Sequence, residues 1–206
     1  MIKLYSDARW DSPWVFTAFV ALTEKGLAFT TEDVDLGKGQ QRAGEYASRS
    51  LTSRVPMLEH DGFHLTESMA IVEYLEESFA PPGHPALLPA DARERARVRQ
   101  VLNWLRTDLG ALREERSTET MFYQRATAPL SDGARAAADK LFTVAGALLA
   151  DGRDTVASRW TLADSDLAFC LHRLIRNGDS VPPRLDSWAR AQWQRPSVKA
   201  YVDHPR

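Results

Sequence analysis

Apolar residues recur at two different spacings along the first 80 residues, and each spacing predicts one kind of element. Short apolar runs between polar residues predict four strands, and apolar residues that return every three or four positions predict the intervening helices. The dipeptide Asp61-Gly62 favours a hairpin between the last two strands. The predicted order is β-α-β-α-β-β-α, over residues 2–5, 13–25, 29–34, 42–50, 55–58, 63–65 and 67–79. This order is typical of a small sheet covered by helices.

The run Pro81-Pro82-Gly83-His84-Pro85 interrupts the pattern and predicts a stiff linker. Every later apolar pattern has helical spacing: a long helix from Asp91 toward Arg116, an alanine-rich helix, and a helix that begins at Thr161. We therefore expect an α/β domain followed by an all-α domain. The predicted bounds are 1–80 for the first domain, 81–90 for the linker and 91–206 for the second domain.

The composition places the chain among ordinary globular proteins. It is 44% hydrophobic, and 26 Lys and Arg against 28 Asp and Glu give a net charge of −2, which offers no general attraction for nucleic acid or an anionic membrane. The apolar stretch 14–22 is too short to span a bilayer, so no membrane association is expected. A single cysteine excludes an internal disulfide and indicates a reducing compartment, most simply the cytoplasm.

Several kinds of chemistry are absent from the sequence. No glycine-rich phosphate loop follows the first strand, and no HExxH motif is present, so we expect neither a nucleotide fingerprint nor a metal site. Cys170 lies within a predicted helix, where a small buried side chain is the expected role rather than a nucleophile.

Ser12 precedes Pro13 at the predicted start of the first helix. Unpaired N–H groups and the positive end of the helix dipole favour an anion at such a place. A hydroxyl there can also donate to a thiolate and lower the pKa of the thiol. The alternative is that Ser12 only caps its own helix.

Val55-Pro56 begins the third predicted strand. Proline belongs at a strand edge, and it keeps the preceding residue extended, so the Val55 backbone can pair with a peptide-like ligand. A plain edge strand is the alternative.

Glu67-Ser68 opens the last helix of the first domain. With Ser68 as the cap, the helix N-terminus can hold the carboxylate of an amino-acid group while Glu67 holds its ammonium. Simple capping is the alternative.

These residues follow one another along the chain in an order that resembles the soluble glutathione S-transferase superfamily, in particular its bacterial serine, theta-like and zeta-like classes. The likeness covers nearly all of the chain. Val55-Pro56 resembles the family's valine and cis-proline pair, Glu67-Ser68 its γ-glutamyl-binding pair, and Ser12-Pro13 its catalytic serine. Thr161 and Asp164 resemble a capping box with a structural role only. The implied fold is a thioredoxin-like domain followed by a helical bundle.

The resemblance implies that glutathione is a co-substrate whose thiolate is stabilised by Ser12. Val55, Pro56, Glu67 and Ser68 would bind the tripeptide, and Arg54 or Gln41 would reach its glycyl carboxylate. The second substrate would be a small hydrophobic electrophile or an organic hydroperoxide, and the protein would be a homodimer. Isomerase and dehalogenase variants use the same thiolate.

Two alternatives stay open at this point. Tyr5 ends the first strand, where the tyrosine classes of the family carry their catalytic hydroxyl, so it competes with Ser12. Phe16, Thr17 and Phe19 stand where many serine-class relatives carry basic residues, which removes that electrostatic support from the thiolate.

The second alternative concerns the function as a whole: the protein would be a non-catalytic binding or regulatory module with the same fold.

Overall fold

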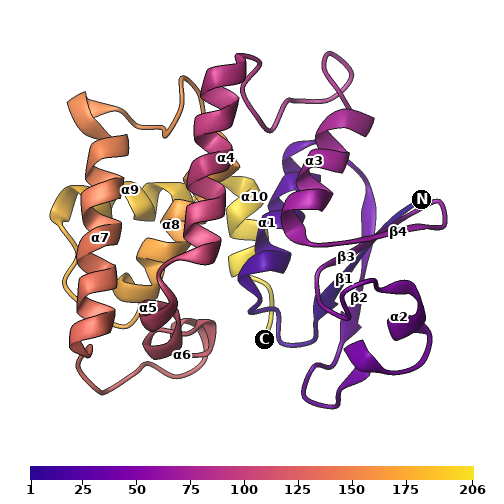
Figure 1. The fold of residues 1–206 in the computed structure, drawn as a ribbon, viewed down its shortest axis with the longest axis horizontal. Coiled ribbons are helices and arrows are strands. Elements are labelled where there is room, and N and C mark those ends of the chain that lie inside the picture. Colours follow the sequence, from indigo (N-terminus) through magenta and orange to yellow (C-terminus); the bar gives the residue numbers. More distant parts are fainter. The chain divides into compact units, whose positions relative to one another are not determined.

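The computed structural model describes residues 1–206 and divides into two compact units (Figure 1). One unit comprises Met1–Leu87 together with Pro196–Arg206, and the other comprises Leu88–Arg195. The elements of the first unit are β1 (Ile2–Asp7), α1 (Pro13–Glu24), β2 (Phe29–Val34), η1 (Gln40–Arg42), α2 (Gly44–Arg49), β3 (Met57–His60), β4 (Phe63–Thr66), α3 (Ser68–Ser78) and α10 (Pro196–Val202).

The first unit is built on one mixed sheet with strand order β2-β1-β3-β4. β1 runs parallel to β2 and antiparallel to β3, and β3 and β4 form the predicted hairpin. The φ values of +49° at Asp61 and +85° at Gly62 are those of a tight hairpin turn. The predicted β-α-β-α-β-β-α order is confirmed.

Strand alternation distributes the side chains between the two faces of this sheet. Leu4 and Leu58 are cross-strand partners and are fully buried. Tyr5 points to the opposite face, where its ring lies 5.5 Å from Tyr46 of α2. α1 packs against α3 and against α10.

The second unit is entirely helical. Its elements are α4 (Ala92–Thr107), α5 (Gly110–Glu115), α6 (Thr118–Phe122), α7 (Asp132–Leu148), η2 (Ala150–Gly152), α8 (Leu162–Ile175) and α9 (Pro183–Trp193). α8 is buried along its whole length and packs against α4, α6 and α9. The predicted fold class is confirmed.

The predicted long helix from Asp91 toward Arg116 is wrong, because it breaks at Leu109. Leu109 has a φ of +60°, and α5 starts at the next residue. Arg113 Nη1 donates to the carbonyl oxygens of Leu105 (3.0 Å) and Arg106 (2.9 Å), which satisfies the end of α4. The apolar spacing continues across this break, so periodicity alone cannot reveal it.

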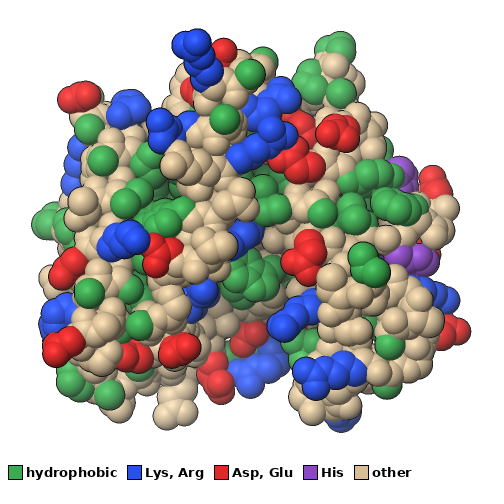
Figure 2. Space-filling view, viewed as in Figure 1, with side chains coloured by type: hydrophobic (Ala, Val, Ile, Leu, Met, Phe, Trp, Pro, Cys, Tyr) green, Lys and Arg blue, Asp and Glu red, His purple; other side chains and the backbone are tan.

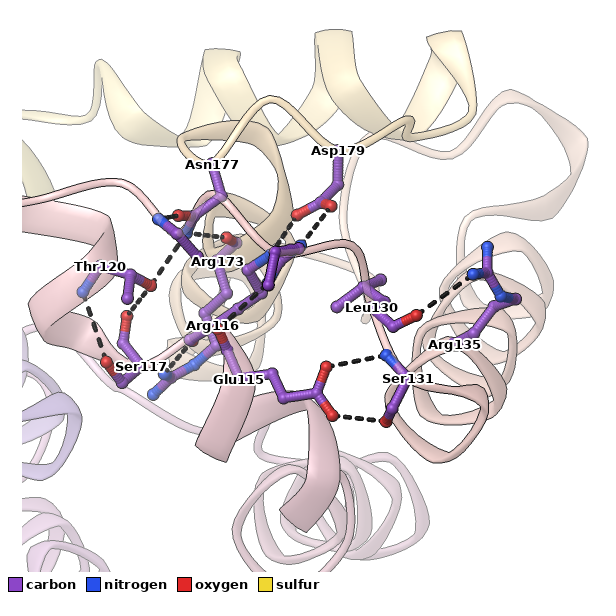
Figure 3. Close-up of polar contacts among 12 residues, drawn as sticks. Glu115, Arg116, Ser117, Thr120, Leu130, Ser131, Arg135, Arg173, Asn177 and Asp179 are labelled. Carbon is purple, nitrogen blue, oxygen red and sulfur yellow. Dashed lines mark hydrogen bonds and ion pairs between the residues drawn. The ribbon is translucent and has the colours of Figure 1, made fainter.

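Arg116 joins the helices at one end of the bundle (Figure 3). Its Nε and Nη2 donate to the two carboxylate oxygens of Asp179 at 2.6 and 2.9 Å, and its carbonyl oxygen accepts from Arg173 Nη1 at 2.9 Å. Arg116 is 3% exposed, and the neighbouring Asp179 raises its pKa. A two-point ion pair of this kind fixes the orientation of both segments.

His172 should make the stability of the protein depend on pH. Burial lowers the pKa of its imidazole to about 4, whereas the unfolded value is 6.5. The unfolded chain therefore binds more protons between these values, and the free energy of unfolding should fall by about 2 kcal/mol through this group as the pH drops from about 7 to about 5. Urea unfolding of wild type and His172→Gln at both pH values checks this prediction, since the variant should lose less stability. An equal loss in both proteins would contradict it.

The boundary between the units differs from the predicted domain boundary at the C-terminal end. Residues 196–206 group with the sheet unit rather than with the helical unit. Tyr201 of α10 is fully buried, and its ring lies 5.4 Å from that of Phe16 in α1. Helical spacing in the sequence does not show which unit a terminal helix packs on.

Charged groups of both signs are interspersed on the face of the molecule drawn in Figure 2. None of the helices combines the length and the apolar character that a bilayer span would need.

Candidate active site

The strand register brings the predicted site residues to one end of the sheet. Tyr5, Met57 and Thr66 are neighbours across β1, β3 and β4. The loop to Ser12 leaves β1 at this end, Val55-Pro56 enters β3 directly before Met57, and Glu67 directly follows Thr66. Because β3 runs opposite to β1 and β4, all three segments converge there, although they lie far apart in the sequence.

Ser12 caps α1. Its Oγ accepts a hydrogen bond from the Val15 N–H at 3.3 Å, and its φ and ψ of −67° and 120° are extended, as a capping residue requires. Pro13 occupies the first helical position, and the first turn contains no acidic residue. Because the hydroxyl oxygen accepts in this contact, its proton can still be donated to a bound anion.

Asp7 and the C-terminal segment hold the loop that carries Ser12. The buried Asp7 carboxylate accepts from the N–H groups of Asp11 (2.9 Å) and Ser12 (3.2 Å), and Tyr201 Oη donates to the Ser12 carbonyl oxygen at 2.9 Å. Trp10 adopts a φ of +52° and stacks on His204 with ring centroids 3.7 Å apart. Sequence reasoning missed these supporting residues, although an aspartate that ends a buried strand was a possible signal for Asp7.

The prediction that Ser68 caps α3 is wrong. Glu67 occupies the capping position with φ and ψ of 72° and 113° and makes no side-chain capping bond, whereas Ser68 is the first helical residue and is buried. A left-handed φ in a residue other than glycine is strained and is characteristic of functional sites. The Glu67 carboxylate is exposed beside the start of this helix, so the predicted pair still flanks one helix N-terminus.

The Val55-Pro56 peptide bond is cis, which agrees with the predicted pair. Val55 precedes the first residue of β3, so the strand ladder that joins Met57 to Tyr5 does not use its backbone groups. Arg54 is exposed, and its carbonyl oxygen accepts from Tyr46 Oη at 2.5 Å. Gln41 lies in η1 with a buried Oε1 that has no hydrogen-bond partner.

The Tyr5 side chain is hydrogen-bonded to Glu59 of the neighbouring strand. Its hydroxyl donates to Glu59 Oε2 at 2.8 Å, and the residue is 3% exposed. Burial and this hydrogen bond raise the pKa of Tyr5, while the same bond lowers the pKa of Glu59. Stabilising a thiolate through Tyr5 would require this bond to break, so the geometry favours Ser12.

Tyr5→Phe should therefore change turnover by no more than about twofold. The variant loses one partly buried hydrogen bond, which is worth about 1 kcal/mol of stability. Steady-state kinetics with glutathione, together with urea unfolding, check both expectations. A fall in turnover larger than that of Ser12→Ala would make Tyr5 the thiolate-stabilising residue.

The capping box at the start of α8 is present. Asp164 is fully buried and accepts from the N–H groups of Thr161 (2.8 Å) and Val156 (2.7 Å), and burial raises its pKa to about 6. All of these partners belong to the helix start and the segment before it, which is a structural role. Cys170 of the same helix is buried, and burial raises the pKa of its thiol, which disfavours a nucleophilic role.

Two family models match the chain. Residues 2–77 match the model of the glutathione S-transferase N-terminal domain, and residues 91–204 match a model of the glutathione S-transferase C-terminal domain. The chain belongs to the glutathione S-transferase family.

The curated relatives of this glutathione S-transferase family member are named for more than one activity. Glutathione S-transferase F10 of Arabidopsis thaliana is 40% identical over 86 residues, which are 42% of this chain and 40% of that protein. Maleylacetoacetate isomerase of Dictyostelium discoideum is 36% identical over 111 residues, which are 53% of this chain and 48% of that protein. The matched segments thus span less than half the length of these relatives.

A solved structure covers far more of the chain. The glutathione transferase homologue from Burkholderia GL BGR1, crystallised with bound glutathione, is 40% identical, with a TM-score of 0.79 over 98% of this chain and 96% of that one. Both units of this glutathione S-transferase family member therefore have counterparts in one known structure.

Proposed function

We propose that the protein is a glutathione transferase that adds the glutathione thiolate to small hydrophobic electrophiles. The observation that carries the proposal is the convergence of two helix N-termini, those of α1 and α3, with the backbone of Val55, which lies outside the strand ladder, at one end of the sheet. Helix N-termini favour anions, and extended backbone favours a peptide. Glutathione supplies a peptide with a thiolate and a carboxylate.

Each residue then has a defined task in binding. The α-carboxylate of the γ-glutamyl group is held at the start of α3 by Ser68 and backbone N–H groups, and its ammonium by the exposed Glu67 carboxylate. The backbone of Val55, set by the cis bond to Pro56, pairs with the cysteinyl unit. Gln41 or Arg54 takes the glycyl carboxylate.

Ser12 stabilises the negative charge that forms on the glutathione sulfur when the thiol loses its proton. The proton passes to solvent, and the thiolate sulfur accepts a hydrogen bond from the Ser12 hydroxyl. The positive end of the α1 dipole stabilises the thiolate further. The first turns of α1 hold Phe16, Thr17 and Phe19 in place of a cation. The hydroxyl should therefore supply a large share of the stabilisation.

The same thiolate supports related reactions. With an organic hydroperoxide, two glutathione molecules give the disulfide, and the hydroperoxide becomes an alcohol and water. The isomerase named among the relatives is a further candidate, because reversible thiolate addition can isomerise a double bond.

Retention on immobilised glutathione, followed by turnover of an activated chloronitroarene and of cumene hydroperoxide, tests the proposal. Retention with turnover of either compound supports it. Retention without turnover of either would indicate the binding-module alternative, and failure of both would contradict glutathione as the ligand.

We further infer a cytoplasmic homodimer. Leu51, in the loop before β3, is 94% exposed, and burial of such a side chain favours association. Light scattering should give twice the mass of one chain.

A further inference from the structure

Each backbone polar group of Ser12 has a partner within the sheet unit, and so has its Oγ as an acceptor. The Ser12 N–H donates to Asp7 Oδ1 at 3.2 Å, and Oγ accepts from the Val15 N–H at 3.3 Å. The Ser12 carbonyl oxygen accepts twice, from the Phe16 N–H at 3.0 Å and from Tyr201 Oη at 2.9 Å. Because these bonds fix the backbone on both sides of the Cα atom as well as the side chain, they determine where the hydroxyl proton can point.

The bond from Tyr201 is the one among them that the helix does not need. The Phe16 N–H supplies the first hydrogen bond of α1, and water can satisfy the second lone pair of such a carbonyl oxygen. Tyr201 takes that place instead, from α10, which packs on α1 although its tyrosine is 189 positions further along the chain (Figure 1). Helix formation alone therefore does not account for this contact.

An aromatic cluster holds the Tyr201 ring. The residue is fully buried, and its ring centroid lies 5.4 Å from that of Phe16, 5.5 Å from that of Phe19 and 5.6 Å from that of Trp10. Rings packed in this way leave little room for movement, so the Tyr201 hydroxyl is held at one point. Phe16 and Phe19 also leave the first turns of α1 without a cation, so a bound thiolate depends more on how the Ser12 hydroxyl is held.

The residues after α10 hold the loop that leads to Ser12. Arg206 Nε donates to the Trp10 carbonyl oxygen at 3.0 Å, and Arg206 Nη1 donates to the Val202 carbonyl oxygen at 2.8 Å. The His204 ring stacks on Trp10. The φ of +52° at Trp10 is strained for a bulky residue and persists only where the surrounding structure enforces it. α10 and the residues after it thus fix this loop at two points, Trp10 and Ser12.

We propose that Tyr201 is a positioning residue for the transferase reaction: its hydroxyl holds the Ser12 carbonyl so that the Ser12 hydroxyl proton stays directed toward the glutathione sulfur. The inference rests on the proposed function and deepens it, because it gives α10 a part in stabilising the bound thiolate. A misplacement of about 1 Å can slow a reaction by up to about 100-fold, so even a smaller shift of the Ser12 hydroxyl should have a measurable effect.

Tyr201→Phe keeps the packed ring and removes only the hydroxyl. At a pH below the pKa of the bound thiol, kcat with an activated chloronitroarene should fall about fivefold, while KM for glutathione stays within about twofold. The loss should shrink to less than about twofold near pH 9, where the bound thiol is ionised in both proteins. Steady-state kinetics from about pH 5 to about pH 9 measure this profile.

Tyr74→Phe is the matched control. Tyr74 of α3 lies in the same unit, and its hydroxyl contacts His60 Nδ1 at 2.7 Å. Urea unfolding should show losses of similar size in the two phenylalanine variants, because each loses one tyrosine hydrogen bond. Only Tyr201→Phe should shift the pH profile, since a hydroxyl with a purely structural role lowers the free energy of unfolding and leaves the profile in place.

A double variant tests whether Tyr201 acts through Ser12. Ser12→Ala combined with Tyr201→Phe should turn over as fast as Ser12→Ala alone, because the hydroxyl that Tyr201 positions is already gone. Losses that multiply in the double variant, or a wild-type pH profile in Tyr201→Phe beside a slow Ser12→Ala, would overturn the inference and leave the transferase proposal standing. Wild type that neither binds glutathione nor turns over would overturn both.

Discussion

Replacing Ser12 by alanine should lower turnover of an electrophile by up to about 100-fold, because one hydrogen-bond donor to a developing or resting anion is worth that much in rate. Glutathione affinity should stay within about threefold of wild type, since the proposed binding contacts come mainly from Val55, Glu67 and Ser68. Steady-state kinetics with calorimetric glutathione titration measure both quantities.

Ser131→Ala is the matched control for this experiment. Ser131 caps α7 and accepts from the Ala134 N–H at 3.2 Å, much as Ser12 accepts from Val15. Each alanine variant should lose about 1 kcal/mol of stability through the lost cap, but only Ser12→Ala should lose turnover. Equal turnover in the two variants would contradict the role of Ser12.

Replacing Asp164 by alanine should lower the free energy of unfolding by about 3–5 kcal/mol. The carboxylate is fully buried and accepts from two backbone N–H groups and the Thr161 hydroxyl. Each buried donor left without a partner costs about 1–3 kcal/mol. Urea unfolding followed by circular dichroism measures the loss.

Asp91→Ala is the control for burial. Asp91 caps α4 in the same manner, accepting from the Arg93 and Glu94 N–H groups, but it is exposed. Water can replace an exposed cap, so this variant should lose only about 1 kcal/mol. Losses of the same size in both variants would show that burial does not determine how much Asp164 contributes to the free energy of unfolding.

Local patterns in the sequence predict the elements of the sheet unit well. Ser12-Pro13 starts α1, and Gly26, with a φ of +65°, follows its end. The Asp61-Gly62 turn lies where the two strands require it. These features depend on neighbours in the chain, so residue types and spacing are sufficient to predict them.

Features that depend on particular side-chain contacts could not be predicted from residue types and spacing. The break at Leu109 is stabilised by Arg113, which reaches back to the carbonyls of α4. The placement of α10 depends on the packing of Tyr201 on α1. The hydrogen bond from Tyr5 to Glu59 joins two strands, and only the strand register brings these side chains together.

The most direct test of the thiolate account is a pH titration of bound glutathione, followed by the ultraviolet absorbance of the thiolate in wild type and Ser12→Ala. The account predicts that the pKa of the bound thiol lies below the ordinary cysteine value of about 8.5 in wild type and rises back toward it in the variant. An identical titration curve for both proteins would contradict it.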